Sequence, residues 1–300
     1  MGESEKTKAP VTPEEIKRVK GLGFLHDKRT EDRFSIRVVT GNGRLTSRQL
    51  RALAQAADDF GNGEAALTTR LSVELQGVPY EKLEDAAAFL KDYDLEPGGT
   101  GPRVRPVVSC KGTVCQYGLI DTYALSEELH REFYQGWHDV KLPHKFKIAV
   151  GGCPNNCVKP DLNDVGIVGQ RVPAPDYDKC RGCKTCVIES GCPMKAAKKV
   201  EGRITVDPEL CSHCGRCAGK CPFGVFENAW DGYRIYIGGR WGKKGAKGRF
   251  LSRIFTSADE VKAMLRRILE FYRQNGQPGE RFADTILRLG FENVEKELLK

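Results

Sequence analysis

The arrangement of the cysteines constrains this 300-residue chain more than any other feature. The first residues, MGESEKTKAPVTPEE, contain no apolar stretch of signal-peptide length, so we expect a cytoplasmic chain. Cytosolic thiols stay reduced, and the cysteines are therefore expected to bind metal rather than form disulfides. All twelve lie in pairs or runs, which divide into three sets of four. They are Cys110 and Cys115, Cys153 and Cys157, the run Cys180, Cys183, Cys186 and Cys192, and the run Cys211, Cys214, Cys217 and Cys221.

The second run, "CSHCGRCAGKCP" at 211–222, follows the C-x2-C-x2-C-x3-C-P pattern of bacterial ferredoxins. In that pattern three thiolates bind one [4Fe–4S] cluster and the fourth binds a neighbouring cluster. The first run, "CRGCKTCVIESGCP", differs only in having five residues before its last cysteine. Two structural zinc sites are the alternative, but zinc favours paired C-x2-C units set well apart. The crossed scheme assigns one cluster to Cys180, Cys183, Cys186 and Cys221, and the other to Cys211, Cys214, Cys217 and Cys192.

The charge balance favours an anionic partner, because 48 Lys and Arg face 40 Asp and Glu. Nucleic acid, an acidic membrane surface and a polycarboxylate cofactor all fit that composition. No run of 18 apolar residues occurs, so we expect no membrane insertion. The basic loop "GGRWGKKGAKGRF" at 238–250 either lines a cofactor site or is an ordinary solvated loop or nucleic-acid arm.

Hydrophobic patterning predicts an α+β chain that a cysteine-rich module interrupts. The first half alternates strands and helices in the order of half a ferredoxin-like unit. A Gly- and Pro-rich stretch at 96–106 indicates a domain boundary. The expected elements are strands at 34–39, 71–77, 104–109, 146–150 and 232–239, and helices from 46 to 60 (Leu50, Leu53, Ala54, Ala57 and Phe60 inward), from 79 to 93, near 126–136 with Ser126 as cap, and at 258–274 (Val261, Leu265, Ile268 and Leu269 inward).

Two motifs, "CKGTVCQYG" and "GGCPNNCVKPDLND", resemble the siroheme and [4Fe–4S] signature of the sulfite and nitrite reductase family. The resemblance implies a third cluster on Cys110, Cys115, Cys153 and Cys157. It also implies that the Cys157 thiolate bridges to a siroheme iron, with Asn155 and Asn156 of the same loop beside the cofactor. Four residues separate Cys110 from Cys115, where the family usually has five.

The segments "TTRL" at 68–71 and "HKFK" at 144–147 resemble the family's substrate-binding positions, which implies that Arg70, Lys145 and Lys147 bind an oxyanion. Strand alternation points both lysines to one side, and two like charges facing inward need an anion. Alone, such a pair is usually a solvated strand edge. Arg105 matches the remaining substrate arginine best. Arg103, Arg240 and Lys243 are expected to bind siroheme carboxylates, and Leu71 stands where the family commonly has Gln.

The closest resemblance is to the siroheme subunit of anaerobic, dissimilatory-type sulfite reductases, which combines one siroheme unit with a two-cluster insert. A single copy of that unit implies a homo-oligomer or a complex with related subunits. The expected fold is α+β, a ferredoxin-like half domain and a siroheme/[4Fe–4S] domain with an inserted bacterial-type 2[4Fe–4S] ferredoxin domain. The expected division is a flexible tail at 1–30, the half domain at 31–98, the siroheme domain at 99–173, the insert at 174–226, and the rest of the siroheme domain with C-terminal helices at 227–300.

The resemblance implies six-electron reduction of sulfite to sulfide, with siroheme and three [4Fe–4S] clusters as cofactors. Reduced ferredoxin or a partner electron-transfer subunit would supply the electrons. Reduction of nitrite to ammonia with the same cofactors is the alternative. An electron-transfer subunit without turnover is an alternative from another class, although the substrate-side charges are present. Nucleic-acid binding rests only on net charge and the basic loop, so no nucleic-acid partner is expected.

Overall fold

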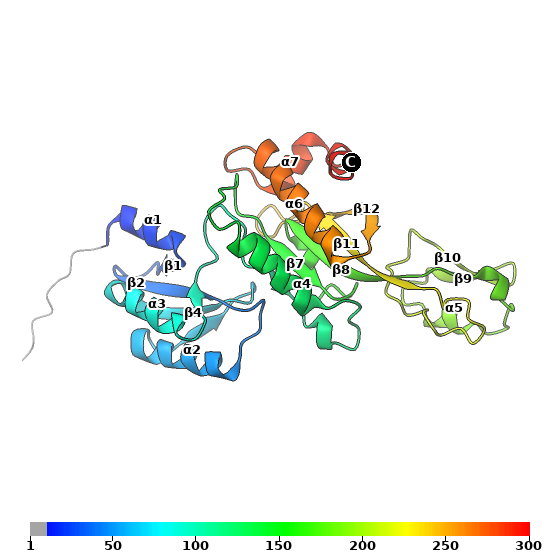
Figure 1. Cartoon of the computed structure of the whole chain (residues 1–300), viewed down its shortest axis with the longest axis horizontal. Helices are drawn as coiled ribbons and strands as arrows, with labels where there is room; N and C mark the ends of the chain where they lie inside the picture. Colours follow the sequence, from blue (N-terminus) through cyan, green and yellow to red (C-terminus); the bar gives the residue numbers. More distant parts are fainter. Residues whose placement is uncertain (1–10) are drawn as a thin grey trace, which may run out of the picture.

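The first part of the chain forms a five-stranded sheet with helices packed on it (Figure 1). The computed structural model describes residues 11–300. The strands pair antiparallel in the order β1-β2-β4-β3, and β5 joins β2. Their bounds are β1 Phe24–His26, β2 Arg33–Val39, β3 Ala65–Leu67, β4 Val73–Pro79 and β5 Glu96–Pro97, with helices α1 Pro13–Gly21, α2 Ser47–Phe60 and α3 Leu83–Lys91.

Helix α2 begins where the sequence predicts, because Thr46 and Gln49 form a capping box. The Thr46 hydroxyl accepts from the Gln49 N–H, and the Gln49 side chain accepts from the Thr46 N–H. Leu53 and Ala57 are buried as expected, but Leu50 is 54% exposed and Ala54, also expected inward, is exposed. Ala52 and Ala56, which directly precede Leu53 and Ala57, are the other buried residues of this helix.

The expected tail at 1–30 is wrong from residue 13 onward. Thr12 caps α1 by accepting from the Glu15 N–H, and β1 pairs antiparallel with β2. Val19 and Phe24 are buried in the first core, which anchors a segment whose composition is mostly polar. Residues 1–10 lie outside the described part of the chain.

The second part is a mixed sheet in the order β12-β11-β8-β7-β6. Strands β6, β7 and β8 are parallel, whereas β8, β11 and β12 are antiparallel. The expected strand at 104–109 is shorter than predicted, since Val104 makes only an isolated bridge to Phe146. The bounds are β6 Val108–Ser109, β7 Ile148–Gly151, β8 Val165–Val172, β11 Trp230–Ile237 and β12 Arg249–Phe255, with helices α4 Thr122–Leu129, α6 Ala258–Asn275, α7 Phe282–Leu289 and α8 Phe291–Leu298.

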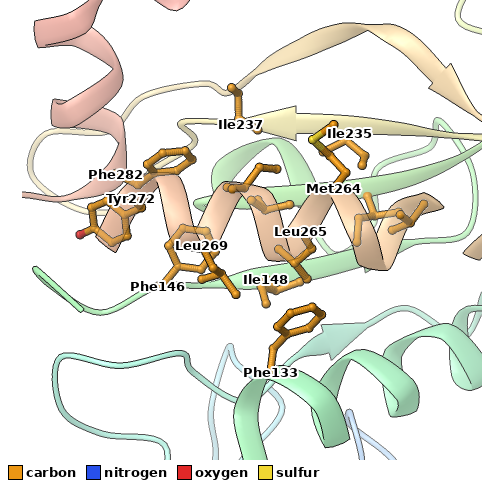
Figure 2. Packing of buried hydrophobic residues seen from close by; sticks show 14 of the residues in the cluster. Phe133, Phe146, Ile148, Ile235, Ile237, Met264, Leu265, Leu269, Tyr272 and Phe282 are labelled. Atoms are coloured by element: carbon orange, nitrogen blue, oxygen red, sulfur yellow. The ribbon is translucent and has the colours of Figure 1, made fainter. Parts of the chain in front are cut away.

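Helices α4 and α6 lie beside each other over the sheet. Lys262 and Arg266 of α6 form ion pairs with Glu128 and Glu132. Figure 2 shows Leu265 and Leu269 of α6 packed with the Phe133, Phe146 and Ile148 side chains. The inward positions predicted for this helix are confirmed: Val261, Leu265, Ile268 and Leu269 are all fully buried.

Helix α4 differs from the prediction in its start and its cap. Asp121 is the cap, accepting from the Tyr123 and Ala124 N–H groups. Ser126 is buried inside the helix, where its hydroxyl bonds to Ser109. The helix then continues as a π-helical segment, His130–Gln135.

The cysteine-rich module protrudes from the second sheet, on the side away from the first sheet (Figure 1). The chain leaves β8 at Val172 and returns directly opposite, at Trp230 of β11. The module contains α5 Val187–Gly191 and a two-stranded sheet of β9 Ala197–Val200 and β10 Arg203–Val206. It has its own small core, made of Ile188, Ala197, Ile204, Val225 and Phe226.

Candidate functional site

A cavity of about 640 Å³ lies where the two sheets meet, and we call it the main cavity. One wall is the turn after β3. The other is made mainly by β6 and the loops after β6 and β7, together with Lys147 before β7 and Trp241 after β11. Among the described residues, none of its lining side chains is acidic. The lining residues are Thr69, Arg70, Leu71, Val108, Ser109, Cys110, Lys111, Lys147, Cys157, Val158, Lys159, Asn163 and Trp241.

A tight turn at Thr68–Ser72 presents Arg70 to this cavity. The Thr68 hydroxyl accepts from the backbone N–H groups of Arg70 and Ser72, and Leu71 adopts a left-handed φ of 61°. The Arg70 guanidinium reaches the second sheet, donating to Asn163 Oδ1 at 2.8 Å and to the Pro106 carbonyl at 2.7 Å. Burial lowers the pKa of Arg70 to about 10, against the attraction of Asp164.

A smaller cavity of about 280 Å³ adjoins the main cavity through Thr69, Arg70 and Lys147, and we call it the cationic cavity. Five of its lining residues are cations and, within the described part of the chain, none is acidic. Such a concentration of like charge is stabilised by an anion. The five are Arg37, Arg70, Arg105, Lys145 and Lys147.

Two of these five cations besides Arg70, namely Arg105 and Lys147, also have lowered pKa values. Arg105 Nε is buried with no hydrogen-bond partner in the described structure. Burial, and then repulsion from Arg37, lowers the pKa of Arg105 to about 10. Burial, and then repulsion from Arg70, lowers the pKa of Lys147 to about 8. Lys147 is therefore close to its titration point near neutral pH.

A buried ion pair supports the strand that carries the lysines. The Lys147 N–H donates to Asp164 Oδ2 at 2.9 Å. Asp164, which is fully buried, also accepts from Arg281 at 2.8 Å. Phe146 points into the core, so Lys145 and Lys147 both face the cationic cavity.

The Cys110, Cys115 and Cys157 thiols all lie near the Cys153 thiol. Burial raises the pKa of the Cys153 thiol, and the other three thiols raise it further. Cys110 Sγ accepts from the Gly152 N–H at 3.1 Å. The two loops meet at Gly112 and Gly152, where a Cβ on Gly152 would lie 2.7 Å from the Gly112 Cα. Cys110 and Cys157 line the main cavity.

The insert brings Cys192 to Cys211, Cys214 and Cys217. Burial raises the pKa of Cys217 to about 11, and the other three thiols add to the shift. All four line one small cavity of about 30 Å³. These contacts agree with one half of the crossed scheme.

Three of the four remaining cysteines of the insert pack against its core. Cys180, Cys186 and Cys221 pack against that core, and Cys180 Sγ accepts from the Ile204 N–H at 3.5 Å. Within residues 11–300, no three His, Cys, Asp or Glu side chains converge closely enough to share one metal ion. A cubane does not need such convergence, because each thiolate binds a different iron.

Five side chains expected beside a siroheme do not line the main cavity. Arg103 contacts His138 Nε2 at 2.7 Å, and Arg240 is paired with Asp284 at 2.8 Å. Lys243 is exposed in the basic loop. Asn155 lines a cavity between the Cys153 and Cys214 loops, whereas Asn156 donates to Asp161 Oδ1 at 2.6 Å and faces a different cavity. Of the residues expected to contact siroheme, only Cys157 borders the main cavity.

Sequence reasoning missed several residues of the two cavities: Arg37, Lys111, Lys159, Asn163 and Trp241. Lys111 directly follows Cys110, and Lys159 and Asn163 lie within the second cysteine motif, so those motifs carried a signal. Arg37 carried none, because it lies in an ordinary strand and enters the cavity only through sheet packing.

The donor set of the main cavity fits a polycarboxylate tetrapyrrole beside an iron–sulfur cluster. Arg70, Lys111, Lys147 and Lys159 supply positive charge, and Cys110 and Cys157 supply thiols. Carboxylates are absent from the lining, as far as the structure describes it, so a polyanion meets no repulsion there.

Two family patterns match nearly the whole chain. Residues 26–93 match the nitrite/sulfite reductase ferredoxin-like half domain, and residues 100–300 match the nitrite and sulphite reductase 4Fe-4S domain. The chain therefore belongs to the siroheme-dependent nitrite and sulfite reductase family, and it is an oxidoreductase.

Several individual proteins are similar over most of the chain. An uncharacterized protein of Methanocaldococcus jannaschii is 30% identical, with 90% of this chain and 94% of that protein covered. Coenzyme F420-dependent sulfite reductase of the same organism is 31% identical over 91% of this chain, but this chain spans only 44% of it. One subunit of the anaerobic sulfite reductase of Salmonella typhimurium is 28% identical, with 87% of this chain and 81% of that protein covered.

A solved structure, that of dissimilatory sulfite reductase I, has a similar fold. It superposes with a TM-score of 0.70 at 22% identity, covering 90% of this chain and 70% of that chain. The predicted α+β class with a ferredoxin-like half domain and a 4Fe-4S domain is thus confirmed.

Proposed function

We propose that this protein catalyses the six-electron reduction of sulfite to sulfide at a siroheme coupled through Cys157 to a [4Fe–4S] cluster. The observation that carries the proposal is the shared wall of the two cavities. Arg70 and Lys147 border both the thiol-lined main cavity and the acid-free cationic cavity. Relatives named as sulfite reductases, among them the Salmonella protein, support the choice of substrate.

Four cations would bind the oxygen atoms of sulfite. Arg70, Arg105, Lys145 and Lys147 can neutralise the anion and stabilise negative charge as S–O bonds break. Lys147 is suited to donate a proton, because its pKa is lowered to about 8. When bound, siroheme supplies an iron for the sulfur lone pair and the electronic chemistry of reduction.

Three cysteine sets would hold three [4Fe–4S] clusters. The first comprises Cys110, Cys115, Cys153 and Cys157. The second set, Cys192, Cys211, Cys214 and Cys217, is the set of the insert nearer to the first. Cys214 and Cys153 line a common cavity of about 420 Å³. The set of Cys180, Cys183, Cys186 and Cys221 is then farther from the main cavity. This order would pass electrons from the insert inward.

Partners of the chain are part of the proposal. Reduced ferredoxin or an electron-transfer subunit would donate electrons, and the chain would form a homo-oligomer or a complex with related subunits. Relatives named as subunits of sulfite reductases support an assembly. Within residues 11–300 no helix is both long and apolar enough to cross a bilayer.

Nitrite reduction to ammonia is the second candidate, because the family as a whole includes nitrite reductases. Both anions present oxygens to the same cations. An electron-transfer subunit without turnover would not need five cations around an acid-free cavity, which argues against that reading.

Anaerobically purified protein tests the proposal directly. Metal, sulfide and tetrapyrrole analysis is expected to give about twelve cluster irons and one siroheme per chain, at four irons per cubane. Steady-state assays with sulfite and nitrite should give a higher kcat/KM for sulfite. Protein that carries no tetrapyrrole under these conditions would refute the proposal, and a higher kcat/KM for nitrite would favour the second candidate.

A further inference from the structure

Two arginines of the cationic cavity share one backbone anchor. The carbonyl oxygen of Gly99 accepts from Arg105 Nη1 and, at 3.5 Å, from Arg37 Nη1. Arg37 belongs to β2 and Arg105 precedes β6, so this carbonyl links the first sheet to the segment that leads into the second. Gly99 itself lines the cavity.

The two arginines depend on this anchor to different degrees. Arg37 is also held by Glu74, with Nη2 to Oε1 at 2.7 Å and Nε to Oε1 at 2.8 Å. Arg105 has Gly99 as its hydrogen-bonded acceptor, while its Nε is buried and unpaired in the described structure. Because the two guanidinium groups repel each other, a displaced Gly99 carbonyl would let Arg105 turn away.

Gly99 is held in turn by Tyr134. The Gly99 N–H donates to the Tyr134 hydroxyl at 3.1 Å, and Tyr134 is 5% exposed. Tyr134 lies in the π-helical segment His130–Gln135, a geometry that often occurs at functional sites. The glycine at position 98 lets the Tyr134 hydroxyl come close to the backbone, since a Cβ there would lie 2.4 Å from the hydroxyl oxygen.

We propose that Tyr134 is a positioning residue for the cationic cavity: its hydroxyl fixes the Gly98–Gly99 peptide, and the adjoining Gly99 carbonyl orients Arg105 and Arg37 toward a bound oxyanion. Tyr134 does not line the cavity and acts through the backbone. The inference rests on the proposed function and adds Arg37 as a fifth cation of the oxyanion site.

The test compares three variants of the full chain, with sulfate as a non-reducible probe. Tyr134→Phe removes the hydroxyl and keeps the ring, and Gly98→Ala keeps the hydroxyl but displaces it. Both should weaken sulfate binding, measured by titration calorimetry, roughly 3- to 10-fold, the effect of one lost hydrogen bond. The KM for sulfite should rise by a similar factor, with a smaller change in kcat. Tyr80→Phe is the control, because its hydroxyl bonds to Glu15 outside both cavities.

Each outcome decides for or against the inference. Sulfate affinity in Tyr134→Phe and Gly98→Ala equal to that of Tyr80→Phe overturns it, even if the wild type reduces sulfite. Weaker sulfate binding in both, in a wild type that lacks sulfite turnover, supports the inference and refutes the proposed function. A wild type that binds no sulfate overturns the inference as well. If Tyr134→Phe lowers the Tm more than Tyr80→Phe does, Gly98→Ala alone decides.

Discussion

At the scale of single residues, burial lowers the pKa values of several cations in the cationic cavity. Arg70, Arg105 and Lys147 have lowered pKa values because solvent is excluded and like charges are close. An oxyanion relieves that repulsion, so the arrangement favours anion binding. Without the anion, the pKa of Lys147 stays lowered to about 8.

Replacing Lys147 should separate its proton-transfer role from general charge. We expect Lys147→Met to lower kcat/KM for sulfite roughly 100-fold or more, the usual contribution of a general acid. A donor must be protonated, so wild-type activity should fall as the pH rises through about 8. Lys147→Arg should move this alkaline limb of the pH–activity profile, the fall in activity, to higher pH. Lys141→Ala, at an exposed lysine, serves as the control. An unchanged alkaline limb in Lys147→Arg would contradict this role.

The buried pair of Asp164 and Arg281 should be costly to break from one side. Asp164→Asn leaves a buried guanidinium unpaired, and we expect a loss of about 3–5 kcal/mol in the free energy of unfolding. Asp231→Asn, which breaks the half-exposed pair with Arg171, should lose under about 1 kcal/mol. Denaturant unfolding measures both, and equal losses would contradict the difference in burial.

At the scale of elements, helix α4 secures a cysteine loop. Asp121 caps the helix and also accepts from the Thr113 hydroxyl at 2.7 Å, which ties the turn before Cys115 to the helix start. Backbone N–H groups, first that of Ala124, lower the pKa of Asp121. The helix cap and the cluster loop are therefore one structural unit.

Removing this cap should reduce iron content as well as stability. Asp121→Ala is expected to lose about 0.5–2 kcal/mol and to bind less iron per chain after equal reconstitution. Thr46→Ala, which removes the side-chain cap of α2, should lose similar stability and keep its iron. Because the folded-state pKa is lowered, the contribution of Asp121 is present above its unfolded pKa and is lost as the pH falls through the folded value. Equal iron content in both variants would refute the coupling.

At the scale of the whole molecule, the insert is joined to the second sheet through the end of β8 and the start of β11. Val172 and Trp230 pair across β8 and β11, and the Arg171 N–H donates to the His213 carbonyl at 2.8 Å. The first sheet lies on the other side of the molecule (Figure 1). The cavities are formed by the two sheets and need no side chain of the insert.

A chain without the insert should keep the main cavity. Joining Val172 to Trp230 by a two-residue turn is compatible with their antiparallel pairing. Iron analysis should then show about eight fewer irons, at four per cubane, while the siroheme spectrum is retained. Full-length protein with Cys192→Ser and Cys217→Ser provides the comparison. Loss of the siroheme spectrum on removing the insert would show that the two parts are interdependent.

The sequence by itself determined the class and much of the chemistry. Cysteine spacing is local, so it identified the motifs of the clusters, and hydrophobic periodicity located α2, α6 and the main strands. The family resemblance came from two short cysteine motifs, "CKGTVCQYG" and "GGCPNNCVKPDLND", and the matches to the two family patterns confirmed it.

Only the tertiary structure decided which distant side chains meet. Arg37 enters the cationic cavity, Arg240 is paired with Asp284, and Tyr134 reaches Gly99 because sheets and helices pack in a particular way. Helix α1 is held by a few buried contacts that its polar composition conceals. Such contacts depend on long-range packing between segments, and no local pattern of residues encodes them.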